Sequence, residues 1–173
     1  MNKSLRQMIL CALLLAIGYI LHYVTPPILG FMKPDFLLSM LFISLLIVDD
    51  IKIDYITGVI AGIITAITTS MPGGQIANPI DKIVTTTVII LIIKLLKDRI
   101  NDKVLSAIVG IIGTLVSGAV FLSVVALVAG LPKAFYLLFV TIVLPATLVN
   151  TIVTVIGYSI IKKIAKYEKT AIK

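Results

Sequence analysis

The sequence predicts an all-α protein, a polytopic membrane bundle of six transmembrane helices with the N and C termini cytoplasmic. Three observations predict this fold. The 173 residues are 60% hydrophobic, with a mean hydropathy of +1.17, and only 13% of them are charged. The apolar residues form long runs, and a run of about 20 is enough to cross a bilayer as a helix. The Lys and Arg residues gather on alternate connections between the runs.

This composition excludes several classes of protein. A soluble globular domain carries about a quarter charged residues, and a disordered chain is poor in apolar ones. The single Cys11 excludes a disulfide framework and a cysteine metal site. We therefore expect one integral-membrane domain, residues 1–173, with no metal and no cofactor.

The first three spans are expected at residues 5–24, 36–48 and 55–71. The first is too long for a signal peptide and lacks a cleavage site. The second run has thirteen residues and would rise only about 20 Å as a helix, so we extend it by a few residues. The third ends at the turn signal Pro72-Gly73-Gly74.

The last three spans are expected at residues 80–96, 104–130 and 145–163. The stretch 134–161 is too long for one straight span and contains Pro145. Proline is favoured in the first turn of a helix, so we expect the last helix to begin there, after a partly inserted segment, 134–144. The runs are continuously apolar and do not alternate, which favours helices over the strands of a barrel.

The basic residues predict the topology. Twelve of the fifteen lie on the side that holds both termini and the connections near residues 49–54 and 97–103, and the other side holds only Lys33, Lys82 and Lys133. By the positive-inside rule, both termini are cytoplasmic. The basic C-terminal tail is expected to orient the protein and to contact anionic membrane lipid, with no role in nucleic-acid binding.

The outer loops, expected at about 25–35, 72–81 and 131–144, differ from the short charged inner connections. The first two hold five of the seven prolines together with many apolar residues. Such segments are typical of a rigid cover packed over the bundle. We therefore look for a binding site at this end of the molecule.

Asp81 and Lys82 are expected at the mouth of the fourth helix, directly before an apolar run. A charge at bilayer depth costs about 2.5–3.5 kcal/mol. Adjacent positions point about 100° apart on a helix, so the two are expected to be poor partners for each other. They could instead hold the two charges of a zwitterion, although this span alone favours interfacial anchors that snorkel to water. Lys33 and Asp35, on either side of Pro34, allow the same two interpretations.

Other polar and small residues have structural and functional interpretations. Asn150, an amide inside the last expected span, could form an interhelical hydrogen bond worth about 0.6–2 kcal/mol, or contact a substrate. The lone His22 is expected to form a loop hydrogen bond. Stripes of small residues on the third and fifth spans predict close helix packing. The Ala12–Ala16 pair on the first span could pack internally or face another protein.

Several motifs are absent. The sequence contains no phosphate-binding loop with its Lys and hydroxyl, so the chain is not expected to hydrolyse ATP by itself. It contains no nucleophile or metal motif of an intramembrane enzyme, so we expect a protein that is not an enzyme. Every Asp is expected at the end of a span, which weakens the case for a proton-coupled carrier.

Two motifs together resemble the tryptophan-transporter family of energy-coupling-factor (ECF) S components. They are PPILGFMKPD, residues 26–35, and MPGGQIANPIDK, residues 71–82. The Ala12–Ala16 pair resembles the Ala-x-x-x-Ala motif with which S components dock on a transmembrane T subunit. The resemblance implies a multi-pass protein of the bacterial cytoplasmic membrane. It would bind tryptophan from outside and deliver it inward with the T subunit and two ATP-binding subunits.

An amino-acid substrate needs partners for its charges and an apolar slot for its side chain. We expect Lys82 or Lys33 to bind the carboxylate and Asp81 or Asp35 the ammonium. The supporting residues are expected to be Phe36, Met71, Gln75, Asn78 and Asn150. The alternatives are a stand-alone ion-coupled secondary transporter of an aromatic amino acid, and a structural or regulatory membrane protein whose loops only cap the bundle.

Overall fold

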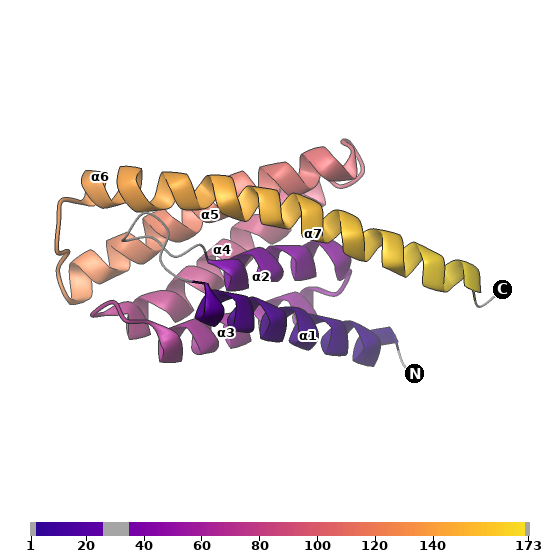
Figure 1. The fold of residues 1–173 in the computed structure, drawn as a ribbon, viewed down its shortest axis with the longest axis horizontal. Helices are drawn as coiled ribbons and strands as arrows, with labels where there is room; N and C mark the ends of the chain where they lie inside the picture. Colours follow the sequence, from indigo (N-terminus) through magenta and orange to yellow (C-terminus); the bar gives the residue numbers. More distant parts are fainter. Residues whose placement is uncertain (1–2, 26–34, 172–173) are drawn as a thin grey trace.

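The computed structural model describes residues 3–25 and 35–171, and the regular elements in these ranges are all helical (Figure 1). In chain order they are α1 (Lys3–Val24), α2 (Phe36–Ile47), α3 (Ile51–Thr68), α4 (Gly74–Leu96), α5 (Asp102–Val128), α6 (Phe135–Leu138), the π-helical turn η1 (Phe139–Val143) and α7 (Leu144–Ala171). Within the described ranges, four helical stretches are long and apolar enough to cross a membrane: α1, α3, α5 and the stretch Phe135–Ile164. The prediction of an all-α membrane bundle is confirmed.

The two termini lie at the same end of the bundle, together with the connections α2–α3 and α4–α5 (Figure 1). We call this end the inner end, because the distribution of Lys and Arg predicts that it faces the cytoplasm. The connections α3–α4 and α5–α6 lie at the opposite end, which we call the outer end. The structure thus agrees with the expected placement of both termini on one side.

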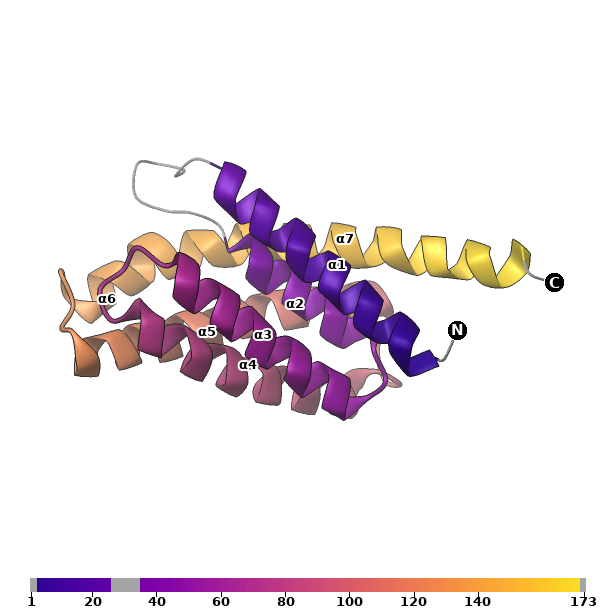
Figure 2. The same ribbon diagram turned by 90° about the horizontal axis from the view of Figure 1, so that it is seen from below.

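Helix α2 is the centre of the bundle (Figures 1 and 2). It packs against α1, α3, α4, α5 and α7, and ten of its twelve residues are buried. A helix that is apolar on all sides is stable only when other helices surround it. The Asp35 carboxylate caps its first turn by accepting a hydrogen bond from the Leu38 backbone N–H, at 2.9 Å.

The expected extension of the second span is wrong. Helix α2 ends at Ile47, because the chain turns at Val48 and Asp50 caps the start of α3. Its twelve residues rise about 18 Å, less than the roughly 30 Å thickness of the hydrocarbon core. Since protein surrounds α2, it has no need to match the thickness of the lipid.

Helix α4 begins at Gly74, six residues before the expected start. Gly73 adopts a left-handed conformation, with φ of 79°, and so closes the tight turn from α3. The Asn78 side chain then donates to the backbone oxygens of Gly74, at 2.9 Å, and of Thr65, at 3.2 Å. Pro79 lies inside the helix. Most of the expected outer loop 72–81 is therefore helical.

The last expected boundary is also wrong. Elements α6, η1 and α7 follow one another without interruption, so residues 135–171 form one helix and most of the expected loop 131–144 is helical. The π-helical turn at Phe139–Val143 ends two residues before Pro145. A proline lacks the N–H for the usual helical bond and clashes with the preceding turn, and a π-turn is a known way to accommodate such a break.

The small residues on α3 and α5 allow neighbouring backbones to approach closely. A Cβ atom on Gly62 would lie 2.9 Å from the Pro79 Cα of α4, and one on Gly110 would lie 2.8 Å from the Thr151 Cα of α7. Either distance is too short for a side chain. The predicted packing role of these two stripes is confirmed at both glycines.

Candidate functional site

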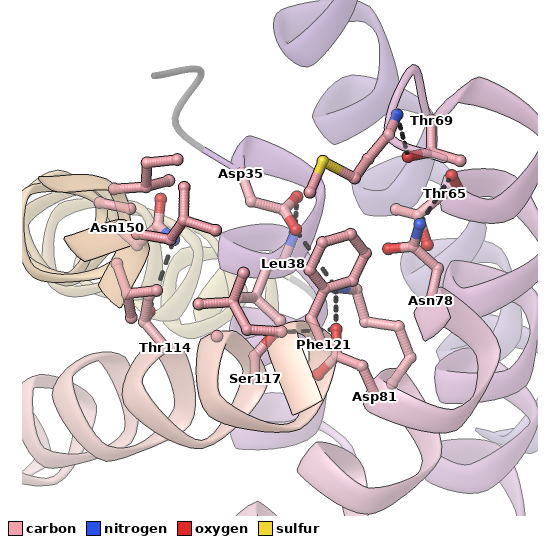
Figure 3. A pocket seen from close by; sticks show the side chains of 18 of the residues that line it. Asp35, Leu38, Thr65, Thr69, Asn78, Asp81, Thr114, Ser117, Phe121 and Asn150 are labelled. Atoms are coloured by element: carbon pink, nitrogen blue, oxygen red, sulfur yellow. Dashed lines mark hydrogen bonds and ion pairs between the residues drawn. The ribbon is translucent and has the colours of Figure 1, made fainter. Parts of the chain in front are cut away.

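A cavity of about 900 Å³ lies in the outer half of the bundle (Figure 3). Its walls come from the N-terminal parts of α2 and α4, the C-terminal part of α3, the second half of α5, and the helix from α6 to the first turns of α7. These parts meet at the outer end because the helices alternate in direction. The short α2 leaves room there, since it does not extend to the outer surface.

Asp81 and Lys82 form a buried ion pair at the cavity. Each is only 1% exposed, and the Lys82 Nζ lies 2.7 Å from Asp81 Oδ2. The expectation of interfacial anchors at the mouth of α4 is wrong, because the helix begins seven residues before Asp81. The expectation that adjacent residues make poor partners is also wrong. The Lys stem has four flexible carbons, which bring the ammonium back to the neighbouring carboxylate.

The pair belongs to a larger network that joins α4, α5 and the N-cap of α2. Lys82 Nζ also donates to Asp35 Oδ2, at 3.2 Å. Asp81 accepts from the hydroxyls of Thr85, to Oδ1, and Ser117, to Oδ2, each at 2.9 Å. Together with Lys82, these hydroxyls compensate for the lost hydration of the Asp81 carboxylate, without which a buried charge would be strongly unfavourable.

The network leaves two groups available to a ligand. An ammonium has three N–H donors, and the bonds from Lys82 to Asp35 and Asp81 use two of them. Asp35 is 27% exposed, and each oxygen of a carboxylate can accept more than one hydrogen bond. Asp81, which is as buried as Lys82 at 1% exposed, already accepts hydrogen bonds from Lys82, Thr85 and Ser117. The geometry therefore favours Asp35 and Lys82 over Asp81 as contact groups.

Two amides lie on opposite sides of the cavity, with Asn78 beside α3 and Asn150 on α7 (Figure 3). The Asn150 Nδ2 donates to the Thr114 hydroxyl of α5, at 3.4 Å, as expected of an interhelical hydrogen bond. Its Oδ1 atom is buried and has no hydrogen-bond partner in the part of the chain that the structure describes. The structural interpretation of Asn150 thus accounts for only half of its amide.

The remaining wall of the cavity is apolar. It is formed by the side chains of Leu38, Phe121, Leu122, Leu137, Leu138, Ile142, Val143 and Ala146. The sequence did not identify the leucines of α6 as site residues, because 134–144 was interpreted as a partly inserted segment, and it gave no signal for Phe121 on α5. The high apolar content of 134–144 was the available signal for these leucines. Thr114 and Ser117 were also missed, since polar residues among small ones on α5 predicted only packing.

Six of the sequence-predicted site residues meet in the cavity: Asp35, Met71, Asn78, Asp81, Lys82 and Asn150. Two others do not line it, since Gln75 is exposed on α4 and Phe36 is half-buried elsewhere on α2. Lys33 lies outside the described residues. His22, for which a loop hydrogen bond was expected, lines the cavity together with Lys133.

Ala12 and Ala16 lie on an exposed face of α1. They line a second cavity of about 630 Å³ between α1 and α3, whose other lining residues include Met8, Leu15, Tyr19, Ile56 and Ile60. Within the described residues, this groove is open and almost wholly apolar. Of the two alternatives for the alanine pair, the structure favours a face that contacts something other than this chain.

The main cavity suits a small molecule that carries both charges and a large apolar group. Binding sites commonly combine an apolar lining with a few convergent polar groups. Here the polar groups gather at the Asp35–Lys82–Asp81 network, and the apolar wall faces it across the cavity. Among the described residues, no group of three or more His, Cys, Asp or Glu side chains could hold a metal ion.

Known proteins with similar sequences are transport proteins. Residues 4–166 match the family model described as tryptophan transporter TrpP. A probable tryptophan transport protein of Clostridium acetobutylicum is 48% identical over 163 residues, which cover 94% of this chain and 95% of that protein. One of Bacillus subtilis is 40% identical over 161 residues, covering 93% of each. No solved structure matches. The chain therefore belongs to the tryptophan transporter family TrpP.

Proposed function

We propose that the protein is the substrate-binding S component of an ECF-type importer in the cytoplasmic membrane of a bacterium. It binds tryptophan from outside, and a T subunit with two ATP-binding subunits brings about its release inward. The observation that carries the proposal is the cavity in the outer half of the bundle, where a buried ion network faces an apolar wall. The names of the matching family and relatives support tryptophan as the substrate.

In this proposal the two charges of tryptophan bind at the network. The Asp35 carboxylate, 27% exposed, receives the substrate ammonium. The remaining N–H of Lys82 donates to the substrate carboxylate. Asp81 does not touch the ligand but holds the Lys82 ammonium in position, at 2.7 Å. The indole ring lies against the apolar wall formed by α5 and α6.

Titration calorimetry of the purified chain tests this arrangement. Asp35→Asn should weaken tryptophan binding at least tenfold, about 1.4 kcal/mol, because it removes the anion that binds the ammonium. Indole-3-propionate lacks the ammonium, so its affinity should change less than about threefold. Asn is also a good helix N-cap, so α2 keeps its first-turn hydrogen bond.

Asp49→Asn is the matched control, since Asp49 is an exposed carboxylate at the inner end, paired with Lys97. It should bind tryptophan as the wild type does. Equal loss of both ligands in Asp35→Asn would show that Asp35 acts through the fold and not on the ammonium. Failure of the wild type to bind tryptophan would refute the proposed function.

A stand-alone ion-coupled transporter of an aromatic amino acid is the second candidate. One observation favours it: Asp81 is buried well inside α4, so the expectation that every Asp lies at the end of a span is wrong. The salt bridge to Lys82 and two hydroxyl donors nevertheless fit a structural carboxylate better than one that exchanges protons. Uptake by the chain alone in vesicles with a proton gradient would favour this candidate. Uptake only with the partner subunits and ATP would favour the S component.

The exposed Ala12–Ala16 face supports the proposed partnership. Small residues allow a second helix to approach closely in a membrane. The groove between α1 and α3 is apolar and lies on the outside of the bundle, and Thr68 is the one described residue that lines both it and the main cavity. We assign it to the T subunit, and the lack of a phosphate-binding loop in the chain is consistent with ATP-binding partners.

A further inference from the structure

Only one of the two polar atoms of the Asn150 side chain has a hydrogen-bond partner among the described residues. The side chain is fully buried, and it lines the main cavity. Its Nδ2 atom is held by the Thr114 hydroxyl, while its Oδ1 atom accepts no hydrogen bond from the described residues. A buried polar atom without a partner is destabilising, so such atoms in native proteins are uncommon and often belong to functional sites. Oδ1 can accept a hydrogen bond from a ligand in this cavity.

Asn150 lies deeper in the bundle than the ion network, as two contacts indicate. The Ser39 hydroxyl donates to the Asn150 backbone oxygen, at 3.5 Å, and Ser39 is four residues, or about 6 Å, further into α2 than Asp35. On α5, Thr114 is one turn closer to the inner end than Ser117, which binds Asp81. The amide therefore lies about one helical turn below the charged groups.

The cavity wall that leads from the outer end to this deeper position is mostly apolar, whereas Asn150 itself contacts the hydroxyls of Thr114, Ser39 and Thr154. Val143 and Ala146 precede Asn150 on the same helix, and both line the cavity. A ligand group that reaches this point must be mainly apolar and must carry one neutral N–H or O–H donor. The indole ring of tryptophan is such a group, with its single N–H on the edge of the five-membered ring, several bonds away from the ammonium and carboxylate.

We propose that Asn150 Oδ1 accepts a hydrogen bond from the indole N–H of tryptophan and thereby selects tryptophan over aromatic amino acids without this donor. This inference rests on the proposed function of the cavity. Thr114 positions the amide by holding Nδ2, so that the oxygen is directed to the ligand. A ligand without the donor leaves the buried oxygen unsatisfied, which is how sites of this kind discriminate against an analogue of the same shape.

The test compares two ligands by titration calorimetry of the purified full chain. L-tryptophan and 3-benzothienyl-alanine have nearly the same shape, but sulfur replaces the indole N–H in the second. The wild type is expected to bind tryptophan at least tenfold more tightly. In Asn150→Leu, tryptophan should lose affinity and the preference should fall below about threefold, while the affinity for the sulfur analogue stays the same or rises.

Thr154→Val is the matched control. Thr154 is also fully buried on α7, one turn further on, and its hydroxyl donates to the Asn150 backbone oxygen, at 2.7 Å. This variant should keep the wild-type preference. A retained preference in Asn150→Leu would overturn the inference.

If Asn150→Leu does not fold, the affinities of the wild type for the two ligands still test the inference. Equal affinity of the wild type for the two ligands would overturn the Asn150 inference and leave the proposed function intact. No binding of either ligand would refute the proposed function, and this inference with it.

Discussion

Lys82→Met is expected to lower the free energy of unfolding by about 3–5 kcal/mol, because it leaves the buried Asp81 carboxylate and the partly exposed Asp35 carboxylate without their cation. The Lys82 ammonium is 1% exposed and contacts Asp81 at 2.7 Å and Asp35 at 3.2 Å. Met is apolar and similar in length to the Lys stem, so the variant removes the charge with little loss of packing. The loss therefore measures the unpaired carboxylates and not a new void.

The double variant Asp81→Asn/Lys82→Met should lose only about 1–2 kcal/mol. It removes both charges of the most deeply buried pair, and the amide that replaces the Asp81 carboxylate can still bond the Thr85 and Ser117 hydroxyls. The remaining Asp35 is partly exposed and keeps the Leu38 N–H. The loss of stability in the double variant should therefore be at least about 1.5 kcal/mol smaller than the sum of the losses in Asp81→Asn and Lys82→Met. Such a difference is expected of two groups in direct contact.

Cys11 provides the assay. It is the single cysteine of the sequence and is 4% exposed, so a thiol-reactive fluorophore should label it only as the protein unfolds. In a chain of this size, 1 kcal/mol corresponds to about 2–4 °C in Tm. Lys82→Met should therefore unfold about 6–20 °C below the wild type in detergent, and the double variant less than about 8 °C below.

Lys162→Met is the control for loss of a lysine charge. Its partner is Asp102 at the inner end, where both side chains are about half exposed, and such pairs contribute less than about 1 kcal/mol. If the losses of Asp81→Asn and Lys82→Met simply add in the double variant, the buried pair does not act as a unit. The interpretation of Asp81 as the group that holds Lys82 would then be wrong.

Three further predictions concern packing, the network and the partner face. Thr85→Val should lower stability by about 1–2 kcal/mol, since it removes a buried donor to Asp81, whereas Thr87→Val, on the same helix and partly exposed, should have little effect; equal losses would contradict the network. Gly62→Ala should cost about 1–3 kcal/mol because its Cβ would lie 2.9 Å from the Pro79 Cα, and an unchanged Tm would show that α3 and α4 can separate freely. Ala16→Leu should leave tryptophan binding unchanged but abolish ATP-dependent uptake with the partner subunits, and retained uptake would remove this face from the interface.

The helical bundle was predictable because the sequence patterns that indicate it lie within single helices. The apolar runs of α1 and α5 are long enough to identify a span without any tertiary information. The close approach at Gly62 and Gly110 was predictable for a similar reason, since the four-residue spacing of small residues places them on one helix face. Six of the predicted site residues also meet in one cavity, as the loop motifs indicated.

The wrong boundaries involve residues whose local preference is overridden by contacts elsewhere. Pro145 indicated a break in the chain, and Pro79 fell within the expected outer loop 72–81. The Asn78 amide supports the start of α4 through Thr65, and the π-helical turn accommodates Pro145. Neither the hydrogen bond from Asn78 to Thr65 nor the π-helical turn can be predicted from the spacing of residues along the chain.

The pairing of Asp81 with Lys82 could not be predicted for the same reason. Helix geometry gives the direction of a Cα–Cβ bond but not the path of a long side chain. The hydroxyl of Ser117, 36 residues away in the sequence, helps to make burial of the carboxylate acceptable. That partner depends on how α5 packs against α4.

The shortness of α2 also has a consequence for translocation. If its inner end is level with one face of the hydrocarbon layer, its Asp35 end lies about 12 Å below the other face, the difference between about 18 and 30 Å. In the proposed mechanism, a substrate held at Asp35 lies more than a third of the way through the hydrocarbon layer before any ATP is hydrolysed. The ATP-dependent step of that proposal then moves the substrate over the remaining distance of about 18 Å, the length of α2.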